Sequence, residues 1–313
     1  MPSNINKRTV DKKVFLTVYC QGGLGNQLFQ FIIGYILAKK NKINLRINIA
    51  SFNTDHRQFM LDRFPEICKL NIPKIKYFNH FAKIYFYLYS KFLKILKILK
   101  VYKFVNYLFF LEKNEFEKSP FIFNKDLLKK NFIKNITIIG FFQSEKYFIY
   151  YKKIVLKLFK FPEIKNKFFQ NYLDLIKNKN SVAIHIRRGD YLKPKPKSFH
   201  GILGENYYKK CISYVKRRVK NPIFFIFSDD IKLVNKTFFF FNDEKFVFID
   251  TKSSINDLNL MSNCKHFIIA NSTFSWWGAW LSKNKNKIVC APKKWVRAKI
   301  STPDIIPKSW IKI

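Results

Sequence analysis

Hydrophobic and polar residues alternate along the chain with two different periods, which predicts strands and helices in turn. Near the N-terminus, Val14–Tyr19 is apolar except for Thr17, as in a strand that is covered on both faces. A glycine-rich turn follows, then the helical stretch Leu28–Lys40 and a second apolar segment, Ile43–Ile49. The chain is therefore expected to open with a β-α-β unit.

The second half repeats this alternation more regularly, which is typical of a parallel, doubly wound sheet in an α/β protein. Strands are expected at Val182–Ile186, Ile223–Phe227, Phe246–Ile249, His266–Ala270 and Lys287–Ala291. Helices are expected at Asn206–Lys220, Ile231–Phe238, Ser254–Asn263 and Thr273–Leu281.

A polar run near the middle of the chain, Lys177–Ser181, separates the two alternating regions and predicts two domains. We expect an N-terminal, acceptor-side domain over residues 1–165 and a C-terminal, donor-binding domain over residues 166–313. Residues 77–111 are rich in Phe, Tyr, Ile, Leu and Lys, which indicates a basic, aromatic-rich helical insert. Its lysines recur every third residue from Lys91 to Lys103, a spacing that winds around a helix and gives no one-sided membrane anchor.

The charge is strongly basic, with 59 Lys and Arg against 20 Asp and Glu and a formal net charge of +39 over 313 residues. Such a charge suits a nucleic acid, an anionic membrane surface or an anionic substrate. The lysines run from end to end, however, as a composition biased toward Lys, Ile, Asn, Phe and Tyr would produce. No RNP, KH or helix-turn-helix pattern accompanies them, so we expect no nucleic-acid partner and keep an anionic membrane surface as an alternative.

The five cysteines are odd in number, scattered and without a CxxC pair, which favours free thiols in a reducing compartment. Cys264 and His266 could form a metal-binding pair, but core packing is the favoured interpretation because no second pair of ligands follows. Val14–Cys20 is too short for a signal-peptide core and has strand length, so we expect neither a targeting segment nor a transmembrane helix. We expect a cytoplasmic protein, with peripheral attachment at the inner face of the membrane as an alternative.

Polar residues gather where the predicted strands of the second half end, the edge at which open parallel sheets bind ligands. After the first strand come Arg187, Arg188 and Asp190. An arginine fork donates paired, charge-assisted hydrogen bonds that match a phosphate group. A surface ion pair with Asp190 is the alternative interpretation. After the next strand, Asp229-Asp230 indicates either a loop acid near a ribose or a solvated turn.

The fourth strand end leads into a helix that Ser272 or Thr273 can cap, with free backbone N–H groups facing the same edge. The two strand ends together predict a bound diphosphate. Other phosphate motifs are missing: there is no GxxxxGK[ST] loop, and Leu28 replaces the third glycine of a dinucleotide fingerprint. No Asp-x-Asp triplet occurs either, so we expect no metal at the diphosphate and no cofactor.

The order of these motifs resembles the bacterial α-1,2-fucosyltransferases, glycosyltransferase family 11, over nearly the whole chain. The matching blocks are Gly22–Gln30, Gly140–Gln143 with Tyr147-Phe148, His185–Tyr191, Asp257–Leu281, Ala291–Trp295 and Ser309–Ile313. The resemblance implies two Rossmann-like domains facing across a cleft, the GT-B type. It also implies inverting, metal-independent transfer of L-fucose from GDP-β-L-fucose to a glycan hydroxyl, expected to be the 2-OH of galactose.

The resemblance further implies roles for individual residues, with Arg187 and Asp190 as the catalytic pair. Arg187 would hold the β-phosphate with Arg188 assisting, and His185 and Asp257 would lie against the guanosine. The other donor-binding residues would line or close over the diphosphate: Gly23, Gly25, Asn26, Ser272, Thr273 and Phe274.

Several assignments stay open. The general base is one, because Asp190 is better suited to holding the arginines and Glu205 equally suits a helix N-terminus. Trp276 is a weaker candidate for contact with the donor sugar, whereas Trp277 and Trp280 have the spacing of a core face. The identity of the acceptor also stays open, and a lipid-linked or lipopolysaccharide glycan at the membrane would fit the basic charge of the chain. Transfer from another nucleotide sugar is the first alternative function, and a basic nucleic-acid-binding protein is the second.

Overall fold

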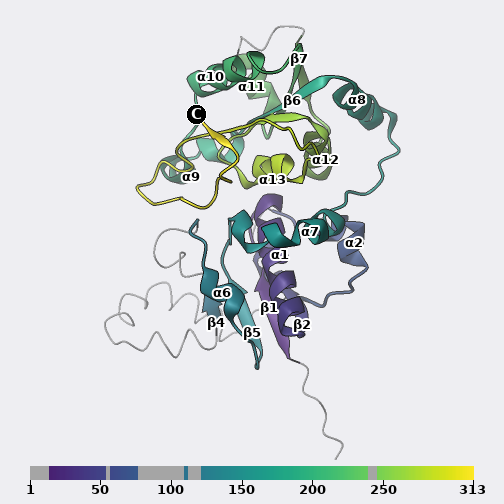
Figure 1. Ribbon diagram of the computed structural model, residues 1–313, viewed down its shortest axis with the longest axis vertical. Coiled ribbons are helices and arrows are strands. Elements are labelled where there is room, and N and C mark those ends of the chain that lie inside the picture. Colours follow the sequence, from purple (N-terminus) through teal and green to yellow (C-terminus); the bar gives the residue numbers. More distant parts are fainter. Residues whose placement is uncertain (1–13, 54–56, 77–108, 112–120, 239–244) are drawn as a thin grey trace, which may run out of the picture.

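The computed structural model describes residues 14–53, 57–76, 109–111, 121–238 and 245–313. Two parallel sheets, one in each half of the chain, form two domains that stand one above the other in Figure 1. The boundary expected at residues 165 and 166 falls between the last helix of the lower domain and the first helix of the upper one. Of the insert expected at 77–111, residues 77–108 lie outside the described residues, and Phe109–Leu111 forms a strand instead of a helix.

The N-terminal sheet has the strand order β3-β2-β1-β5-β4, and every pairing is parallel. Its strands are β1 (Phe15–Tyr19), β2 (Asn44–Asn48), β3 (Lys74–Ile75), β4 (Phe109–Leu111) and β5 (Ile136–Ile139). Because β1 and β5 are neighbours, the loops that leave their carboxyl ends lie side by side. The helices of this domain are α1 (Leu24–Asn41), α2 (Pro65–Cys68), α6 (Lys125–Lys129) and α7 (Lys152–Leu158).

The C-terminal sheet has the order β11-β10-β9-β6-β7-β8 and is also parallel throughout. Its strands are β6 (Asn180–Ile186), β7 (Pro222–Ser228), β8 (Phe246–Ile249), β9 (His266–Ile268), β10 (Val289–Ala291) and β11 (Ile311–Lys312). Its helices are α8 (Lys167–Asn178), α9 (Pro194–His200), α10 (Glu205–Lys216), α11 (Ile231–Thr237), α12 (Ser254–Asn263) and α13 (Thr273–Leu281). The chain leaves β6 toward β7 and leaves β9 toward β10, so these two neighbours flank a topological switch point, where ligands bind in such sheets.

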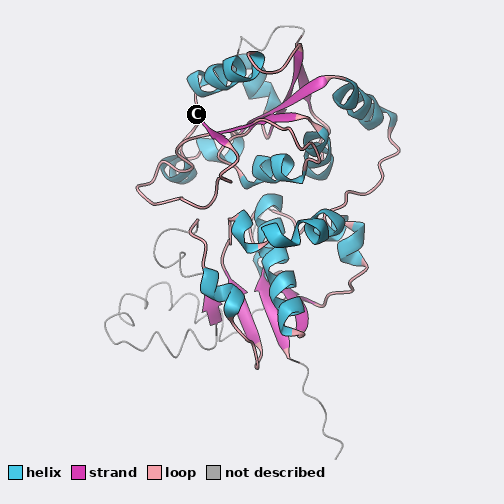
Figure 2. Cartoon of the chain, viewed as in Figure 1, coloured by secondary structure: helices cyan, strands magenta, loops and turns pink. Residues whose placement is uncertain are grey.

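Both faces of the C-terminal sheet are covered by helices, which explains why its strands are continuously apolar (Figure 2). Along β7, Phe224 and Ile226 pack with residues of α10 and α11. Phe225 and Phe227 pack on the opposite face with residues of α12 and α13. The expected doubly wound sheet is therefore confirmed.

Helix α1 begins at Leu24, four residues before the expected start at Leu28. Gly23 has the extended backbone of an N-cap residue, so the glycine turn itself opens the helix. The polar Gln27 is buried in the first turn, where its Nε2 donates to the Gly22 carbonyl oxygen at 3.0 Å and to the Gln58 carbonyl oxygen at 2.9 Å. Residues 24–27 therefore belong to the helix and not to a loop, and the polar Gln27 is tolerated there because its buried amide is hydrogen-bonded.

The two domains join where the first turns of α1 and α13 meet. The Trp277 indole Nε1 donates to the Gly25 carbonyl oxygen at 2.9 Å, and the Thr273 hydroxyl donates to Asn26 Oδ1 at 3.0 Å. Phe29 lies with its ring centroid 4.6 Å from that of Trp276 and 4.8 Å from that of Trp277. These rings belong to one hydrophobic cluster that includes residues of both sheets.

Trp276 corrects one expectation about the donor sugar. Its side chain is fully buried, and its Nε1 donates to the Ile305 carbonyl oxygen at 2.6 Å. Its ring belongs to the joint between the domains and does not line the cavity described below. Trp277 and Trp280 are buried as their spacing predicted.

Cys264 and His266, for which core packing was expected, belong to no group of three or more His, Cys, Asp or Glu able to hold a metal within the described residues. Cys264 is buried, and His266 Nδ1 accepts a hydrogen bond from the Ile288 backbone N–H at 3.1 Å. Throughout the described ranges, no helix is both long and apolar enough to span a bilayer.

We predict that Gly25→Ala destabilises the protein by about 1–3 kcal/mol, the usual cost of overpacking a close contact. A Cβ atom at this position would lie 2.5 Å from the Thr273 backbone carbon, so the two helices must separate. Gly23→Ala is the matched control, because a Cβ there meets nothing within 4 Å and costs only the N-cap preference of glycine. Thermal unfolding of the two variants and the wild type measures the difference, and equal losses of Tm would contradict the proposed contact.

Candidate active site between the domains

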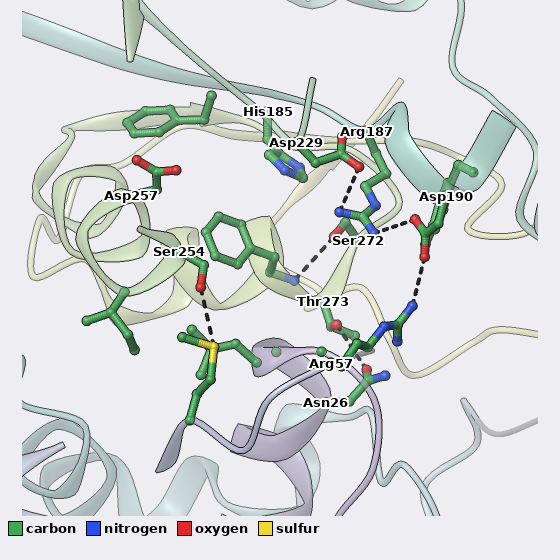
Figure 3. A pocket seen from close by; sticks show the side chains of 18 of the residues that line it. Asn26, Arg57, His185, Arg187, Asp190, Asp229, Ser254, Asp257, Ser272 and Thr273 are labelled. Carbon is green, nitrogen blue, oxygen red and sulfur yellow. Dashed lines mark hydrogen bonds and ion pairs between the residues drawn. The ribbon is translucent and has the colours of Figure 1, made fainter. Parts of the chain in front are cut away.

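A cavity of about 1200 Å3 lies between the two domains, at the carboxyl ends of both sheets. The loops after β1 and β5 line it from the N-terminal domain, and the loops after β6 and β9 line it from the other side. The sequence predicted eleven site residues, and all except Arg188 line this cavity: Gly23, Gly25, Asn26, His185, Arg187, Asp190, Asp257, Ser272, Thr273 and Phe274. Figure 3 shows how their side chains converge.

Arg187 lies at the centre of an ion-pair network. Its Nη1 is 3.0 Å from Asp229 Oδ2, and its Nη2 donates to Asp190 Oδ1. The other oxygen of Asp190 pairs with Arg57 Nη2 at 2.7 Å, which brings an arginine of the N-terminal domain into the same network. Three of these four residues come from loops that follow β6 and β7, and Arg57 comes from the opposite domain (Figure 3).

Asp229 is fixed more rigidly than Asp190. Its Oδ1 accepts the Arg188 backbone N–H at 2.7 Å, while its Oδ2 holds Arg187. Gly189 makes this approach possible, because a Cβ atom at that position would lie 2.1 Å from Asp229 Oδ2. Asp229 positions the arginine, and Asp230 caps α11 by accepting the Leu233 backbone N–H at 3.0 Å. Neither a loop acid near a ribose nor a solvated turn therefore describes both residues.

Arg188 does not reach the cavity. Its guanidinium is buried, donates to the carbonyl oxygens of Arg187 at 2.9 Å and Leu203 at 3.1 Å, and lies 4.9 Å from the centre of the Phe238 ring. Both arginines lie beyond the end of β6; Arg187 lines the cavity, whereas Arg188 braces the loop through these carbonyl contacts.

The N-terminus of α13 forms the wall opposite Arg187. Ser272 is its N-cap and accepts the Phe274 backbone N–H at 3.4 Å. Across the domain joint, Asn26 Oδ1 accepts hydrogen bonds from Gln143 Nε2 and from the Thr273 hydroxyl, each at 3.0 Å. Asn26 itself lines the cavity. The backbone N–H groups at the N-terminus of α13 make this wall suited to an anion.

His185 is buried against this wall, with its ring centroid 5.5 Å from that of Phe274. The pKa of His185 is lowered to about 3, chiefly by burial and in part by the nearby Arg187. The imidazole is therefore neutral at physiological pH. Its buried Nδ1 has no hydrogen-bond partner among the described residues.

Asp257 lies at the far end of the cavity from Asp190 (Figure 3). It stands in the first turn of α12, and its Oδ1 accepts the Thr251 hydroxyl at 2.7 Å. The pKa of Asp257 is raised to about 6, chiefly by burial and in part by Asp250, against the opposing effect of the Thr251 hydrogen bonds. Ser254 and Ile255 line the same end and come from the same helix.

Arg57 and His200 are among the cavity residues that sequence reasoning missed. Arg57 is one of 59 basic residues and follows no predicted strand end, so nothing in the sequence distinguished it. His200 ends α9 and stacks on Tyr191, with ring centroids 4.4 Å apart. Burial lowers the pKa of His200 to about 4. Glu205 lies outside the cavity, in the first turn of α10, where it pairs with Lys209 at 2.8 Å.

The sequence profile of glycosyl transferase family 11 matches residues 15–313, almost all of the chain. The chain belongs to this family. It is 34% identical over 310 residues to an alpha-1,2-colitosyltransferase of Escherichia coli, covering 93% of this chain and 96% of that protein. It is 32% identical over 315 residues to the O-antigen biosynthesis glycosyltransferase WbnK of Escherichia coli, covering 93% and 98%.

Among solved structures, this family 11 glycosyltransferase is similar to the fucosyltransferase NodZ from Bradyrhizobium, with a TM-score of 0.47 and 13% identity. That alignment covers 86% of this chain and 93% of NodZ. The expected two facing α/β domains are confirmed by the parallel sheets of the structure itself and by the cavity between them.

Asp257 generates a prediction about pH. Because its folded pKa of about 6 lies above that of an unfolded aspartate, the group stabilises the fold below about pH 4, and this contribution is lost as the pH rises through 6. We predict that Asp257→Asn, which stays neutral, is more stable than the wild type at pH 7.5 by up to about 2 kcal/mol. The gain should vanish at pH 4.

Thermal unfolding of the Asp257→Asn variant and the wild type across this pH range measures the effect. Asp174→Asn, on the exposed face of α8, is the control and should show no pH-dependent gain. A constant difference between Asp257→Asn and the wild type at all pH values would contradict the raised pKa.

Proposed function

We propose that this enzyme transfers L-fucose from GDP-β-L-fucose to a glycan hydroxyl, with inversion at the anomeric carbon, and forms an α-1,2 linkage. The observation that carries the proposal is the placement of Arg187 and the α13 N-terminus, which follow the neighbouring strands β6 and β9 and line one cavity. An arginine fork facing a helix N-terminus is a site for a diphosphate. Membership of family 11 supports a sugar nucleotide as its carrier.

The proposed reaction is a single displacement. The acceptor hydroxyl attacks the anomeric carbon from the face opposite the diphosphate, the bond from that carbon to the β-phosphate oxygen breaks, and its electron pair leaves with GDP. Negative charge therefore grows on the diphosphate in the transition state. Donors that are already fixed around it stabilise this charge more strongly than that of the bound substrate.

In this scheme Arg187, the backbone N–H groups of α13 and the amide of Asn26 stabilise the leaving group, and no metal takes part. His185 lines the cavity as a neutral ring, so it adds no charge beside the diphosphate. Asp257 faces the end of the cavity that we assign to the guanosine, where a carboxylate can accept hydrogen bonds from the base. The proton acceptor for the attacking hydroxyl stays unassigned.

A second donor sugar is favoured by one of the comparisons, because the relative that is 34% identical is named a colitosyltransferase. Colitose is fucose without its 3-hydroxyl group. A site that hydrogen-bonds this hydroxyl discriminates against the deoxy sugar by about 10⁴-fold, whereas an apolar pocket discriminates weakly. The ratio of kcat/KM for GDP-fucose and GDP-colitose therefore decides between the two donors.

For the acceptor, we propose the 2-OH of a galactose in a lipid-linked or lipopolysaccharide glycan, presented at an anionic membrane surface. The name of WbnK, an O-antigen biosynthesis glycosyltransferase, supports this class of acceptor. A surface of the N-terminal domain also supports it. Nine large hydrophobic side chains are exposed in the described parts of the chain, and four of them lie in the six-residue segment Ile149–Ile154.

Segment Ile149–Ile154 combines apolar and basic side chains, the composition of a membrane-interface site. Tyr150 is 93% exposed, and Lys152 and Lys153 follow Tyr151 without an acidic residue between them. We predict that Tyr150→Ser with Ile154→Ser reduces sedimentation with phosphatidylglycerol vesicles at least about fivefold. Ile133→Ser, at an exposed site elsewhere, is the control. Unchanged sedimentation of the double variant would remove this surface from the proposal.

The donor is tested by thermal unfolding with GDP, GDP-fucose, UDP and ADP, in EDTA. A ligand at one hundred times its dissociation constant adds about 2.7 kcal/mol to the free energy of unfolding. We expect a stabilisation by the guanine nucleotides that EDTA leaves unchanged. Equal shifts with all four compounds, or none, would contradict the proposed donor, and loss of the shift in EDTA would contradict the metal-independent scheme.

Arg187→Ala should lower kcat by about 10²–10³, the usual loss when one fixed donor to a developing anion is removed. Arg187→Lys should recover little of this loss, because an ammonium group has no fork. Arg217→Ala, an exposed arginine of the same domain, is the control for loss of charge. Turnover assays with GDP-fucose measure all three variants, and an Arg187→Ala activity within tenfold of the wild type would refute the proposed role.

A further inference from the structure

A single carboxylate, that of Asp190, joins arginines of both domains across the cavity. Its Oδ1 accepts from Arg187 Nη2 of the C-terminal domain, and its Oδ2 accepts from Arg57 Nη2 of the N-terminal domain at 2.7 Å. The Asp190 side chain is 20% exposed, so this bridge is partly shielded from water. Figure 3 shows both guanidinium groups pointing toward this carboxylate, each at a different oxygen. An anion with two oxygens thus already occupies the space between the arginines.

The charges of this network cancel, which matters for a diphosphate. Arg57 and Arg187 carry two positive charges, and Asp190 and Asp229 carry two negative ones. A diphosphate that entered the intact network would meet both carboxylates and find each guanidinium already engaged. Favourable binding at the arginines therefore requires one carboxylate to give up its place.

The structure distinguishes which carboxylate can leave. Asp229 holds the Arg188 backbone N–H as well as Arg187, and its Oδ2 fits against the bare Cα of Gly189. The carboxylate of Asp190, in contrast, has the two arginines as its only hydrogen-bond partners among the described residues. It stands on a short 3-10 turn, Gly189–Leu192, at the rim of the cavity. Asp190 can turn away without breaking a backbone contact, whereas Asp229 cannot.

We propose that Asp190 is an internal anion that holds the diphosphate position before the donor binds, and that the donor diphosphate displaces it from Arg57 and Arg187. Arg57 then becomes a second cation on the leaving group, supplied by the N-terminal domain. This inference rests on the proposed function, because it assumes that the cavity takes a diphosphate. It assigns to Arg57 a binding role that its position in the sequence did not indicate.

Two roles for Asp190 predict opposite signs. If Asp190 competes with the diphosphate, Asp190→Asn removes the competitor and should tighten GDP binding by about tenfold, the value of one hydrogen bond to a charged group. If Asp190 only positions Arg187, the same substitution should weaken GDP binding. Isothermal titration calorimetry with GDP, and with guanosine as the probe without phosphates, separates the two.

Arg57→Ala should weaken GDP binding about tenfold or more and leave guanosine binding unchanged. In the Arg57→Ala background, Asp190→Asn should tighten GDP binding less than it does in the wild type, since half of the bridge is already gone. Arg46→Ala is the control for loss of one positive charge from the N-terminal domain. Its guanidinium packs 3.8 Å from the centre of the Phe15 ring, outside the cavity.

Inorganic pyrophosphate keeps this test separate from that of the proposed donor. If the wild type fails to select GDP but binds pyrophosphate, and the variants shift pyrophosphate binding in the predicted directions, the donor proposal fails and the displacement stands. Weaker binding of GDP and pyrophosphate to Asp190→Asn would overturn the displacement, as would unchanged binding to Arg57→Ala. Should Asp190→Asn prove unstable in thermal unfolding, the Arg57→Ala result decides alone.

Discussion

The site depends on one close contact, the approach of the first turn of α1 to the first turn of α13 at Gly25. Because Gly25 has no side chain, the two backbones come into contact. Two hydrogen bonds then cross the joint, one from Trp277 to the Gly25 carbonyl oxygen and one from Thr273 to Asn26. The contact brings the carboxyl ends of the two sheets face to face. A cavity with donors on both walls follows from this geometry, because the α13 N-terminus and the Asn26 amide lie at the same joint.

Burial determines which ionisable side chains in and around the cavity carry a charge that a ligand can meet. His185 is neutral because it is buried beside Arg187, and Arg188 is buried where backbone carbonyl oxygens replace its hydration. Among 59 basic residues, the arginines of the site act through their partners and not through the overall charge of the chain. The contrast between the fixed Asp229 and the less constrained Asp190 shows how local contacts decide what two like carboxylates can do.

The sequence predicted the elements whose residues face a two-sided core, including α12 and α13 with the bounds that the structure gives them. It missed β5, a strand of only four residues, and it placed Trp276 near the ligand because spacing alone does not distinguish a joint between domains from a cavity wall. Strand ends located most of the site, since side chains at the carboxyl edge of a parallel sheet must converge. Arg57 was not predicted because it reaches the cavity from an irregular segment, where no helix or strand periodicity indicates which way a side chain points.

The shared aromatic core has a consequence for how the protein comes apart. Phe29 and Phe148 of one domain and Trp276, Trp277 and Trp280 of the other fill a single cluster, so neither half covers its own apolar surface. A fragment cut near residue 165 would leave three tryptophans facing water. We therefore expect the two halves to unfold together, because the cluster is lost when they separate, although the chain contains two sheets.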